Sequence, residues 1–421
     1  MGDNEHLYMP RFADGELSQR LARSGAVVIR GPKWCGKTET ARQQAKSVLY
    51  MQNPDTYQSN MLLAATKPSV LLRGDKPRLI DEWQVAPALW DAVRFDVDTT
   101  RARGGYILTG SATPGEKPLH SGAGRFSIMD MRTMTLFEQC LSSGEVSLAA
   151  LMDGGEPDGS AAMDVEDYAR AVCRGGWPEV VARGEDGQGL AHDYLVAVAD
   201  EDISNVDGVQ RSADYAMLAM RAYARCTSTQ ADMAKVRADI IAHGDDMSRN
   251  TLSAYVNALR SLYVLEDLEA WKPSLRDKTR VTSTPTRHFT DPSLAAAALG
   301  ATPESLLADM PTLGALFESL CIHDLRIYAR ACGGSLYHYR DDSGRESDAV
   351  VVFPDGRWAL VEVKLGARNV DQGAKGLLDL ASKIDQGIVG PPAFLAVVST
   401  GPYAYRRPDG VLEIPLACLT K

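Results

Sequence analysis

The sequence lacks the features of a membrane or secreted protein. No window approaches the roughly 18 consecutive apolar residues that a spanning helix needs. The first residues, MGDNEHLYMPRF, are polar and lack the apolar stretch of a secretory signal. We therefore expect a cytoplasmic protein with no membrane partner.

Recognisable disulfide and zinc patterns are also missing. The 7 cysteines are scattered, odd in number and form no CxxC pair, and the 7 histidines form no HxxxH or HExxH pattern. These absences argue against a zinc ribbon or a disulfide framework and favour a reducing environment. The net charge of -10 argues against a chain that coats nucleic acid indiscriminately, although a local basic face is compatible with it.

What is present is an ordinary globular composition, 45% hydrophobic and 24% charged, in a chain of 421 residues. That length predicts two or three domains. We expect an α/β core over 1–150, a helical region over 165–290 and a second α/β module over 291–421. The Gly/Ser/Asp-rich stretch around 153–160 indicates a surface loop or linker near a boundary.

The first module alternates strand and helix patterns. Buried strands are expected at 25–31, 69–72, 77–83 and 104–112, with a helix at 39–51 after the first of them. Strands separated by helices predict a parallel, doubly wound sheet.

A phosphate-binding loop follows the first strand. The letters GPKWCGKT match GxxxxGK[ST], with an apolar strand before and a helix after. Backbone N–H groups of such a loop surround the phosphates, Lys37 reaches the β- and γ-phosphates, and Thr38 ligates Mg²⁺. The expected cofactors are therefore ATP and Mg²⁺. The expected nucleotide contacts are Gly31, Pro32, Lys33, Trp34, Cys35, Gly36, Lys37, Thr38 and Thr40.

An apolar strand at 79–82 ends in two acids. Asp81 fits the Walker B role of holding Mg²⁺, and Glu82 fits the general base that activates the attacking water. Two adjacent acids at a strand end also occur on ordinary surfaces, so the assignment depends on the phosphate loop.

Two later segments offer further catalytic candidates. YILTGSATP places Ser111, or alternatively Thr109, where a sensor residue contacts the γ-phosphate, although a simple turn residue is the competing interpretation. In HSGAGRFSIMDMRTM, Arg125 could act as an arginine finger on a neighbouring subunit. Arg132 is a competitor, and an exposed structural arginine is an equal alternative.

The middle region has the pattern of a winged helix-turn-helix. STQADMAKVRADI and MSRNTLSAYVNALRSLYVLEDLEAW predict two helices and a strand, with Ser248 as an N-cap and WKPSLRDKTRV as a wing. Arg249 and Arg260 could contact phosphate from the second helix. A plain helical bundle with a solvated face is the alternative. Trp177, in GGWPE, is expected to be a packed turn residue.

The last module carries acids and a lysine on neighbouring strands. Asp348 begins one strand, and Glu362 and Lys364 lie on one face of the next because strand side chains alternate. Two acids can ligate Mg²⁺ while the lysine positions or activates water. This pattern resembles the core of PD-(D/E)XK nucleases.

That resemblance leaves alternatives open. Glu318 resembles the first-helix acid of that group, and Glu346 and Gln372 are further candidates. Charges that alternate on half-exposed strands give the same pattern by chance. A nuclease-like fold can also bind DNA or protein without cutting.

Taken together, GPKWCGKT, LIDEWQ, LTGSATP, GAGRFS, MRTMTLFE, GGWPE and EVKLG resemble the bacterial and archaeal AAA+-type ATPases that carry a C-terminal domain of unknown function. The resemblance covers nearly the whole chain. It implies an AAA+ core, a winged-helix middle and a nuclease-like C-terminus, and little about substrate.

Three functions compete on this basis. The first is an ATP-hydrolysing motor or switch, expected as a homo-oligomer and most simply a hexamer, that acts on DNA, whether branched or single-stranded. The second is a STAND-like signalling ATPase whose C-terminal module binds protein. The third is a non-catalytic nucleotide-binding scaffold. Whether the last module cuts DNA stays open.

Overall fold

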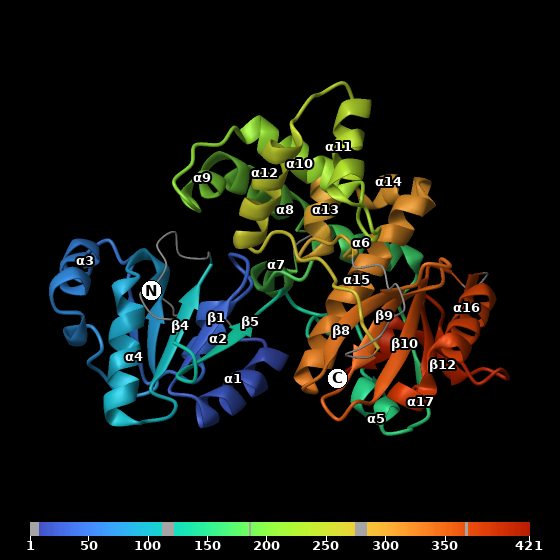
Figure 1. Ribbon diagram of the computed structural model, residues 1–421, viewed down its shortest axis with the longest axis horizontal. Helices are drawn as coiled ribbons and strands as arrows, with labels where there is room; N and C mark the ends of the chain where they lie inside the picture. Colours follow the sequence, from blue (N-terminus) through green and yellow to red (C-terminus); the bar gives the residue numbers. More distant parts are fainter. Residues whose placement is uncertain (1–7, 112–121, 185–186, 274–283, 367–368) are drawn as a thin grey trace.

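The computed structural model describes residues 8–111, 122–184, 187–273, 284–366 and 369–421. It forms an N-terminal α/β body, a helical body and a C-terminal α/β body (Figure 1). Residues 274–281 of the predicted wing, 271–281, and the end of LTGSATP, 112–114, lie outside the described residues. Within those five ranges, no helix combines the length and apolar character that a membrane span requires.

A parallel sheet organises the N-terminal body. Its strands are β1 (Ala26–Arg30), β2 (Ser47–Tyr50), β3 (Arg78–Asp81), β4 (Tyr106–Gly110) and β5 (Phe126–Asp130). They lie in the order β2-β3-β4-β1-β5, and all the neighbouring pairs are parallel. The predicted parallel α/β core is confirmed, and β1 lies between β4 and β5, so its C-terminal end is enclosed on both sides.

Helices cover both faces of this sheet. They are α1 (Phe12–Arg23), α2 (Lys37–Arg42), α3 (Tyr57–Thr66) and α4 (Ala88–Thr100). Val27 and Ile29 pack with α1 and α2, whereas Ala26 and Val28 pack with α3 and α4. The alternation of side chains along β1 therefore supplies two separate cores.

Two local predictions in this body are wrong. The expected helix at 39–51 ends at Arg42, and its second half is β2, in register with β3 through the pair Ser47↔Arg78. The expected strand at 69–72 is instead a short 3₁₀ turn that begins at Pro68, followed by buried side chains that fill the core against α4. In both places tertiary packing decided between helix and strand, because short apolar runs suit either structure.

The helical body contains helices on both sides of the predicted boundary at 291. They are α6 (Val165–Arg174), α7 (Pro178–Arg183), α8 (Gln188–Ala197), α9 (Ile203–Asn205), α10 (Ala213–Ala224), α11 (Met233–Ala242), α12 (Arg249–Ser261), α13 (Pro292–Leu299) and α14 (Pro303–Ala308), with a π-helical turn η3 (Val198–Asp202) between α8 and α9. The almost wholly buried α13 packs on α6, α8 and α10. We expected α13 in the C-terminal module, but its apolar surface is buried in the helical body.

The predicted helix pair forms as α11 and α12. Ser248 caps α12, because its Oγ accepts a hydrogen bond from the backbone N–H of Thr251 at 3.1 Å. After α12 the chain makes antiparallel bridges that pair Leu265 with Phe289 and Leu268 with Thr286. Two helices are thus followed by the base of a hairpin.

A mixed sheet forms the C-terminal body. Its main elements are α15 (Met310–Ala331), β8 (Ser335–Arg340), β9 (Glu346–Val352), β10 (Trp358–Lys364), α16 (Val370–Lys383), α17 (Gln386–Val389), β11 (Leu395–Ser399), β12 (Tyr403–Arg406) and β13 (Leu412–Pro415). With β7 (Gly159–Ser160) at one edge, the strand order is β7-β12-β13-β11-β10-β9-β8. Leu360 packs toward α16, whereas Val361 packs in the cluster that contains α15, so these helices cover opposite faces.

The expected linker around 153–160 belongs to this C-terminal body. β6 (Val146–Ser147) pairs with β14 (Leu419–Thr420), and α5 (Leu148–Met152) follows it. β7 (Gly159–Ser160) then pairs with β12 at the edge of the large sheet. Residues 153–158 form turns and coil that are mostly exposed, so the predicted surface loop is confirmed, and it lies within the C-terminal body because the short strands on either side pair with strands more than 200 residues away.

Residues 131–139, which we call the seam segment, run from the end of β5 through the junction of the three bodies. Within it, the Thr133 hydroxyl donates to Asp291 Oδ2 at 2.6 Å. The same oxygen accepts the backbone N–H of Gly176 at 3.0 Å, and Oδ1 accepts the N–H of Ser293 at 2.8 Å. One fully buried carboxylate therefore joins the seam segment, the GGWPE turn and α13.

A second buried carboxylate fastens the seam segment to α15. Asp324 Oδ2 accepts the backbone N–H of Leu136 at 2.9 Å, and its Oδ1 lies 2.8 Å from His323 Nδ1. His323 Nε2 lies 2.9 Å from the hydroxyl of Thr133. This hydroxyl–imidazole–carboxylate row resembles a nucleophile relay, but it is buried and its hydroxyl is donated to Asp291, so its role is structural.

We predict that Asp291→Ala destabilises the protein by about 3–5 kcal/mol, because it leaves buried N–H and hydroxyl donors without an acceptor. The measurement is denaturant unfolding. The matched control is Asp309→Ala, which removes a solvent-exposed N-cap from α15 and should cost only about 1 kcal/mol. Equal losses for the two variants would contradict the role given to Asp291.

Candidate functional site: a phosphate loop and an acid–lysine cluster

The phosphate loop joins the C-terminal end of β1 to α2. Gly36, at φ 95° and ψ 15°, begins α2, and Trp34 also adopts a positive φ of 63°. At Gly31 a Cβ atom would lie 2.1 Å from the carbonyl oxygen of Met131, so only glycine allows β5 to approach. The buried Lys37 Nζ donates to the carbonyl oxygens of Gly31 at 3.0 Å and Pro32 at 2.6 Å. The lysine thus lies inside the loop that would hold phosphates.

The acids of β3 lie beside this loop, as the sequence predicted. Asp81 Oδ1 accepts hydrogen bonds from the Thr38 hydroxyl at 2.7 Å and from the Thr109 hydroxyl at 2.6 Å. These three side chains come from α2, β3 and β4, which meet because the strands are parallel and in register. A carboxylate and hydroxyls are the oxygen ligands that Mg²⁺ prefers, so the residues present fit the magnesium of a nucleotide complex.

Glu82 occupies a special backbone position. It adopts left-handed φ 55° and ψ 44°, which is uncommon for a residue other than glycine. Its Oε2 accepts hydrogen bonds from Gln84 Nε2 and, at 3.3 Å, from the Ser111 hydroxyl. Gly110 makes room, because a Cβ there would lie 2.7 Å from Gln84 Oε1. The two candidates Glu82 and Ser111 are therefore in direct contact.

Gln84 is a site residue to which the sequence analysis gave no role. It lies in LIDEWQ, two positions after Glu82, and nothing in that spacing marked it as a site residue. Arg11 was also missed. Its guanidinium donates to the carbonyl oxygens of Cys35 at 3.0 Å and Arg132 at 2.8 Å, so it supports the phosphate loop from below.

The helical body contacts the phosphate loop from the other side. Lys33 Nζ pairs with Asp202 Oδ1 of η3 at 2.6 Å, and the exposed ring of Trp34 meets that of Tyr194 edge-on at 6.0 Å. Near Thr40, another predicted contact residue, the hydroxyl of Tyr8 lies 2.9 Å from the Thr40 hydroxyl. The helical body therefore contacts residues of the phosphate loop directly.

The two arginine candidates have different positions. Arg125 is partly exposed, pairs with Asp98 of α4 at 2.6 Å and precedes β5, at the edge of the sheet opposite the phosphate loop. It is remote from its own phosphate loop. Arg132 is buried in a bidentate pair with Glu266, so its candidacy as an arginine finger is wrong.

The second cluster, which we call the acid–lysine cluster, lies at the end of β10, where Glu362 and Lys364 face Gly373 of α16. Asp348 Oδ2 accepts the backbone N–H of Val363 at 2.7 Å, and Lys364 Nζ donates to Glu362 Oε1 at 2.6 Å. Glu318, on α15, faces the same group. Predicted residues from one helix and two strands are thus brought together.

The pKa values of these acids are raised by burial and mutual repulsion. Burial and the charge of Asp348 raise the pKa of Glu362 to about 8, against the opposing charge of Lys364. Burial raises the pKa of Asp348 despite Lys364 and the N–H of Val363. Burial and the charges of Asp348 and Glu362 raise the pKa of Glu318 well above its usual range. Burial and mutual repulsion therefore favour the protonated forms of these acids.

The other candidates are less well placed. Glu346 is exposed and pairs with Arg340 at 3.2 Å, and Gln372 is exposed on α16. In the ranges that the structure describes, no group of three or more His, Cys, Asp or Glu side chains has the arrangement to hold a metal ion. The predicted metal role of Asp348 and Glu362 would therefore need a change of side-chain positions, beginning with the release of Lys364 from Glu362.

In the helical body, Arg260 pairs with the buried carboxylate of Asp267 at 2.6 Å, which takes it away from a phosphate-contacting role. Arg249 is exposed at the start of α12. Trp177 is fully buried and its Nε1 donates to Ser293 Oγ at 3.0 Å, so its prediction as a packed residue is confirmed.

The parallel sheet, the glycine-supported phosphate loop and the acids beside it define the N-terminal body as a P-loop ATPase core. Residues 23–140 match the family described as an AAA domain. Residues 165–305 and 313–419 match two domains of unknown function, DUF8612 and DUF4143. The last match begins within α15, in agreement with the observed body.

Two curated relatives are similar over most of the chain. They are the uncharacterized proteins Rv2008c of Mycobacterium tuberculosis and Mb2031c of Mycobacterium bovis, each 24% identical over 96% of this chain and 83% of their own length. Among solved structures, the Walker-type ATPase paby2304 of Pyrococcus abyssi aligns with 70% of this chain and 97% of its own at 10% identity. Its TM-score of 0.40 is too low to support an argument.

We predict that Glu362→Gln makes the protein more stable than the wild type at pH 9, by on the order of 1–3 kcal/mol. The pKa of Glu362 is raised from 4.5 to about 8, so the stability it contributes is present below pH 4.5 and is lost as the pH rises through 8. Glutamine cannot ionise, so the variant should lack this loss of stability with rising pH. Thermal unfolding between pH 5 and 9 measures it, with the exposed Glu346→Gln as control. If Glu362→Gln lost stability with pH as steeply as the wild type, that result would contradict the raised pKa of Glu362.

Proposed function

We propose that this protein binds ATP with Mg²⁺ and hydrolyses it at the phosphate loop. The observation that carries the proposal is the contact of Thr38 with Asp81, with Glu82 next along the chain and Lys37 inside the loop. In this proposal Lys37 binds the β- and γ-phosphates, Thr38 and Asp81 hold the magnesium, and Glu82 takes the proton of the attacking water.

Before water attack, Glu82 must face the terminal phosphate. Its present partners, Gln84 and Ser111, hold its carboxylate in one place, and Ser111 is the nearer sensor candidate because it contacts Glu82 directly. Thr109 instead contacts Asp81, on the side of the metal. Of the two sensor candidates, Ser111 therefore contacts the proposed general base, whereas Thr109 contacts the proposed metal ligand.

We expect Lys37→Ala to lower ATP turnover at least 100-fold and to weaken nucleotide binding, because the loop loses its charge toward the phosphates. Glu82→Gln should lower kcat about 100-fold or more and keep nucleotide binding, since it removes only the base. The measurement is phosphate release together with binding of a fluorescent ADP analogue. Lys46→Ala, an exposed lysine beyond α2, is the control. If neither variant lowers turnover, hydrolysis at this site is wrong.

We further propose a ring, most simply a hexamer, in which Arg125 contacts the nucleotide of a neighbouring subunit. Its partial exposure and its position away from its own phosphate loop support this assignment. Mass photometry with a non-hydrolysable ATP analogue tests it, and a monomer as the sole species would reject the ring.

DNA is the proposed partner on which ATP turnover acts. Support comes from the helix pair α11 and α12 with its hairpin base, the pattern of a winged helix, and from the acid–lysine cluster. Arg249 at the exposed start of α12 is the remaining phosphate candidate on that helix. Turnover measured with single-stranded, duplex and branched DNA tests this partner. Nucleotide-dependent assembly without a DNA effect would favour the signalling alternative.

If the C-terminal cluster cuts DNA, Asp348→Ala and Lys364→Ala should each abolish Mg²⁺- or Mn²⁺-dependent cleavage, because one removes a metal ligand and the other the group that positions water. The assay is cleavage of labelled duplex and branched DNA. Lys383→Ala, exposed at the end of α16, should cut like the wild type. Cleavage that survives both changes would assign the activity elsewhere.

A further inference from the structure

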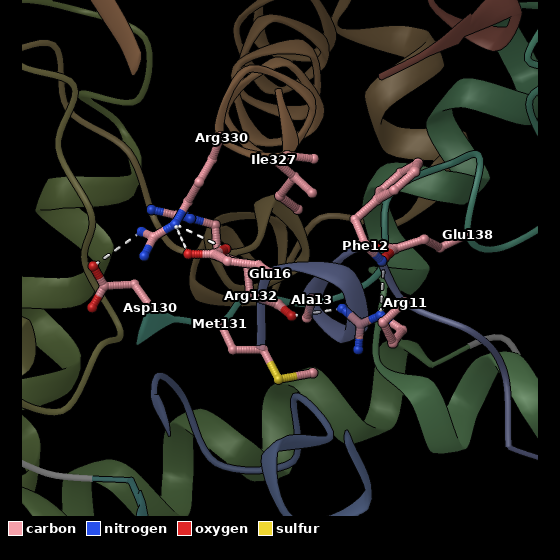
Figure 2. A pocket seen from close by; sticks show the side chains of 11 residues that line it. Arg11, Phe12, Ala13, Glu16, Asp130, Met131, Arg132, Glu138, Ile327 and Arg330 are labelled. Carbon is pink, nitrogen blue, oxygen red and sulfur yellow. Dashed lines mark hydrogen bonds and ion pairs between the residues drawn. The ribbon is translucent and has the colours of Figure 1, made fainter. Parts of the chain in front are cut away.

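Arg330, near the C-terminal end of α15, reaches across to the ATPase core. Its Nε lies 2.9 Å and 3.1 Å from the two carboxylate oxygens of Glu16 on α1, and its Nη1 lies 3.2 Å from Asp130 Oδ2 at the end of β5 (Figure 2). Asp130 also pairs with Arg30. Since Arg30 directly precedes Gly31, the carboxylate of Asp130 connects Arg330 of the C-terminal body to the residue before the phosphate loop.

The network is compact and partly buried. Arg330, Glu16 and Asp130 expose 23%, 16% and 33% of their side chains, and the cavity they help to line has a volume of only about 30 Å³, room for a single water molecule. Burial alone would raise the pKa of Asp130, but the hydrogen bond and charge of Arg30 and the charge of Arg330 hold it below its usual range. The acid is therefore charged at neutral pH and responds to both arginines.

Other residues of α15 make Arg330 part of a stiff connection. One turn earlier, Arg326 pairs with Glu266 at 3.0 Å, and Glu266 also holds Arg132. Asp324 binds the seam segment at Leu136, as described above. Glu318 of the acid–lysine cluster lies on the same helix, about 18 Å from Arg330 along the axis at 1.5 Å per residue.

We propose that Arg330 is a positioning residue for the phosphate loop, supplied by the C-terminal body, and that through it α15 links nucleotide binding to the acid–lysine cluster. The proposal rests on the nucleotide binding proposed above. Arg330 acts through Asp130 and Arg30, which set the end of β1 from which the loop departs.

The coupling has a direct physical basis. Loss of Arg330 leaves Asp130 with Arg30 alone and Glu16 with Arg20 alone, although Tyr328 of α15 still packs on Phe12 of α1. A shift of the loop on nucleotide binding would then lose its charged connection to α15 through Asp130. By linkage, a change in the acid–lysine cluster must alter nucleotide affinity to the same extent that nucleotide alters the cluster.

Arg20 provides a matched control. It pairs with the same Glu16 at 2.6 Å, but it lies on α1 within the ATPase core and does not bridge two bodies. We therefore expect Arg330→Gln to weaken binding of a fluorescent ADP analogue about fivefold or more and to raise KM for ATP, while Arg20→Gln stays within about twofold of the wild type. Arg330→Lys, which keeps the charge but loses the forked contact, should lie between them.

The second readout is hydrogen exchange at β10, which carries Glu362 and Lys364. Nucleotide should change exchange there in the wild type and in Arg20→Gln, but not in Arg330→Gln at a nucleotide concentration that saturates it. Equal behaviour of Arg330→Gln and Arg20→Gln in both readouts overturns the proposal. If Arg330→Gln does not fold, the graded response of Arg330→Lys decides the question by the same criteria.

The two proposals can fail separately. A wild type that binds nucleotide without turnover rejects hydrolysis, while the affinity and exchange readouts still test Arg330. A wild type that turns over ATP, with Arg330→Gln matching the control, rejects the positioning role and leaves hydrolysis intact.

Discussion

The hydrogen bond between the Thr133 hydroxyl and the buried carboxylate of Asp291 is the contact on which the arrangement of the three bodies depends. The same carboxylate binds the GGWPE turn and the start of α13. The buried carboxylate of Asp324 joins α15 to the seam segment in the same way. A buried carboxylate is costly unless its oxygens are fully hydrogen-bonded, and that cost makes the arrangement specific. The segment that leaves the ATPase core is therefore fixed to the other two bodies and is not a flexible linker.

Because this junction is fixed, the phosphate loop and the acid–lysine cluster have a defined position relative to each other. The phosphate loop lies at the enclosed end of β1, where the helical body reaches it through Asp202 and Tyr194. The acid–lysine cluster lies on the opposite half of α15 from the arginines that contact the core. The phosphate loop offers Lys37 and backbone N–H groups to an anion, whereas the acid–lysine cluster contains more acids than bases.

The predictions from the sequence are confirmed where the residues concerned are close together in the chain. The glycine pattern, Lys37 and Thr38 are adjacent in the chain, and the strand before them and the helix after them follow from apolar periodicity. Glu362 and Lys364 were placed on one face of a strand by alternation alone. The predictions failed where a partner is distant: the second half of 39–51 became β2, the short strands β6 and β7 paired with β14 and β12, and Arg132 paired with Glu266. Gln84 and Arg11 carried no pattern that marked them.

The sequence by itself determined that this chain contains a phosphate loop with two acids on a later strand, because those groups are specified by residue type at short spacing. It also determined the acids and lysine of the last module. Only the tertiary structure decided that Thr38 and Thr109 share Asp81, that Glu318 joins Asp348 and Glu362, and that Arg330 reaches the core. The physical reason is that hydrogen bonds and ion pairs depend on distances of about 3 Å between atoms. Such distances between residues hundreds of positions apart are fixed only when the bodies pack.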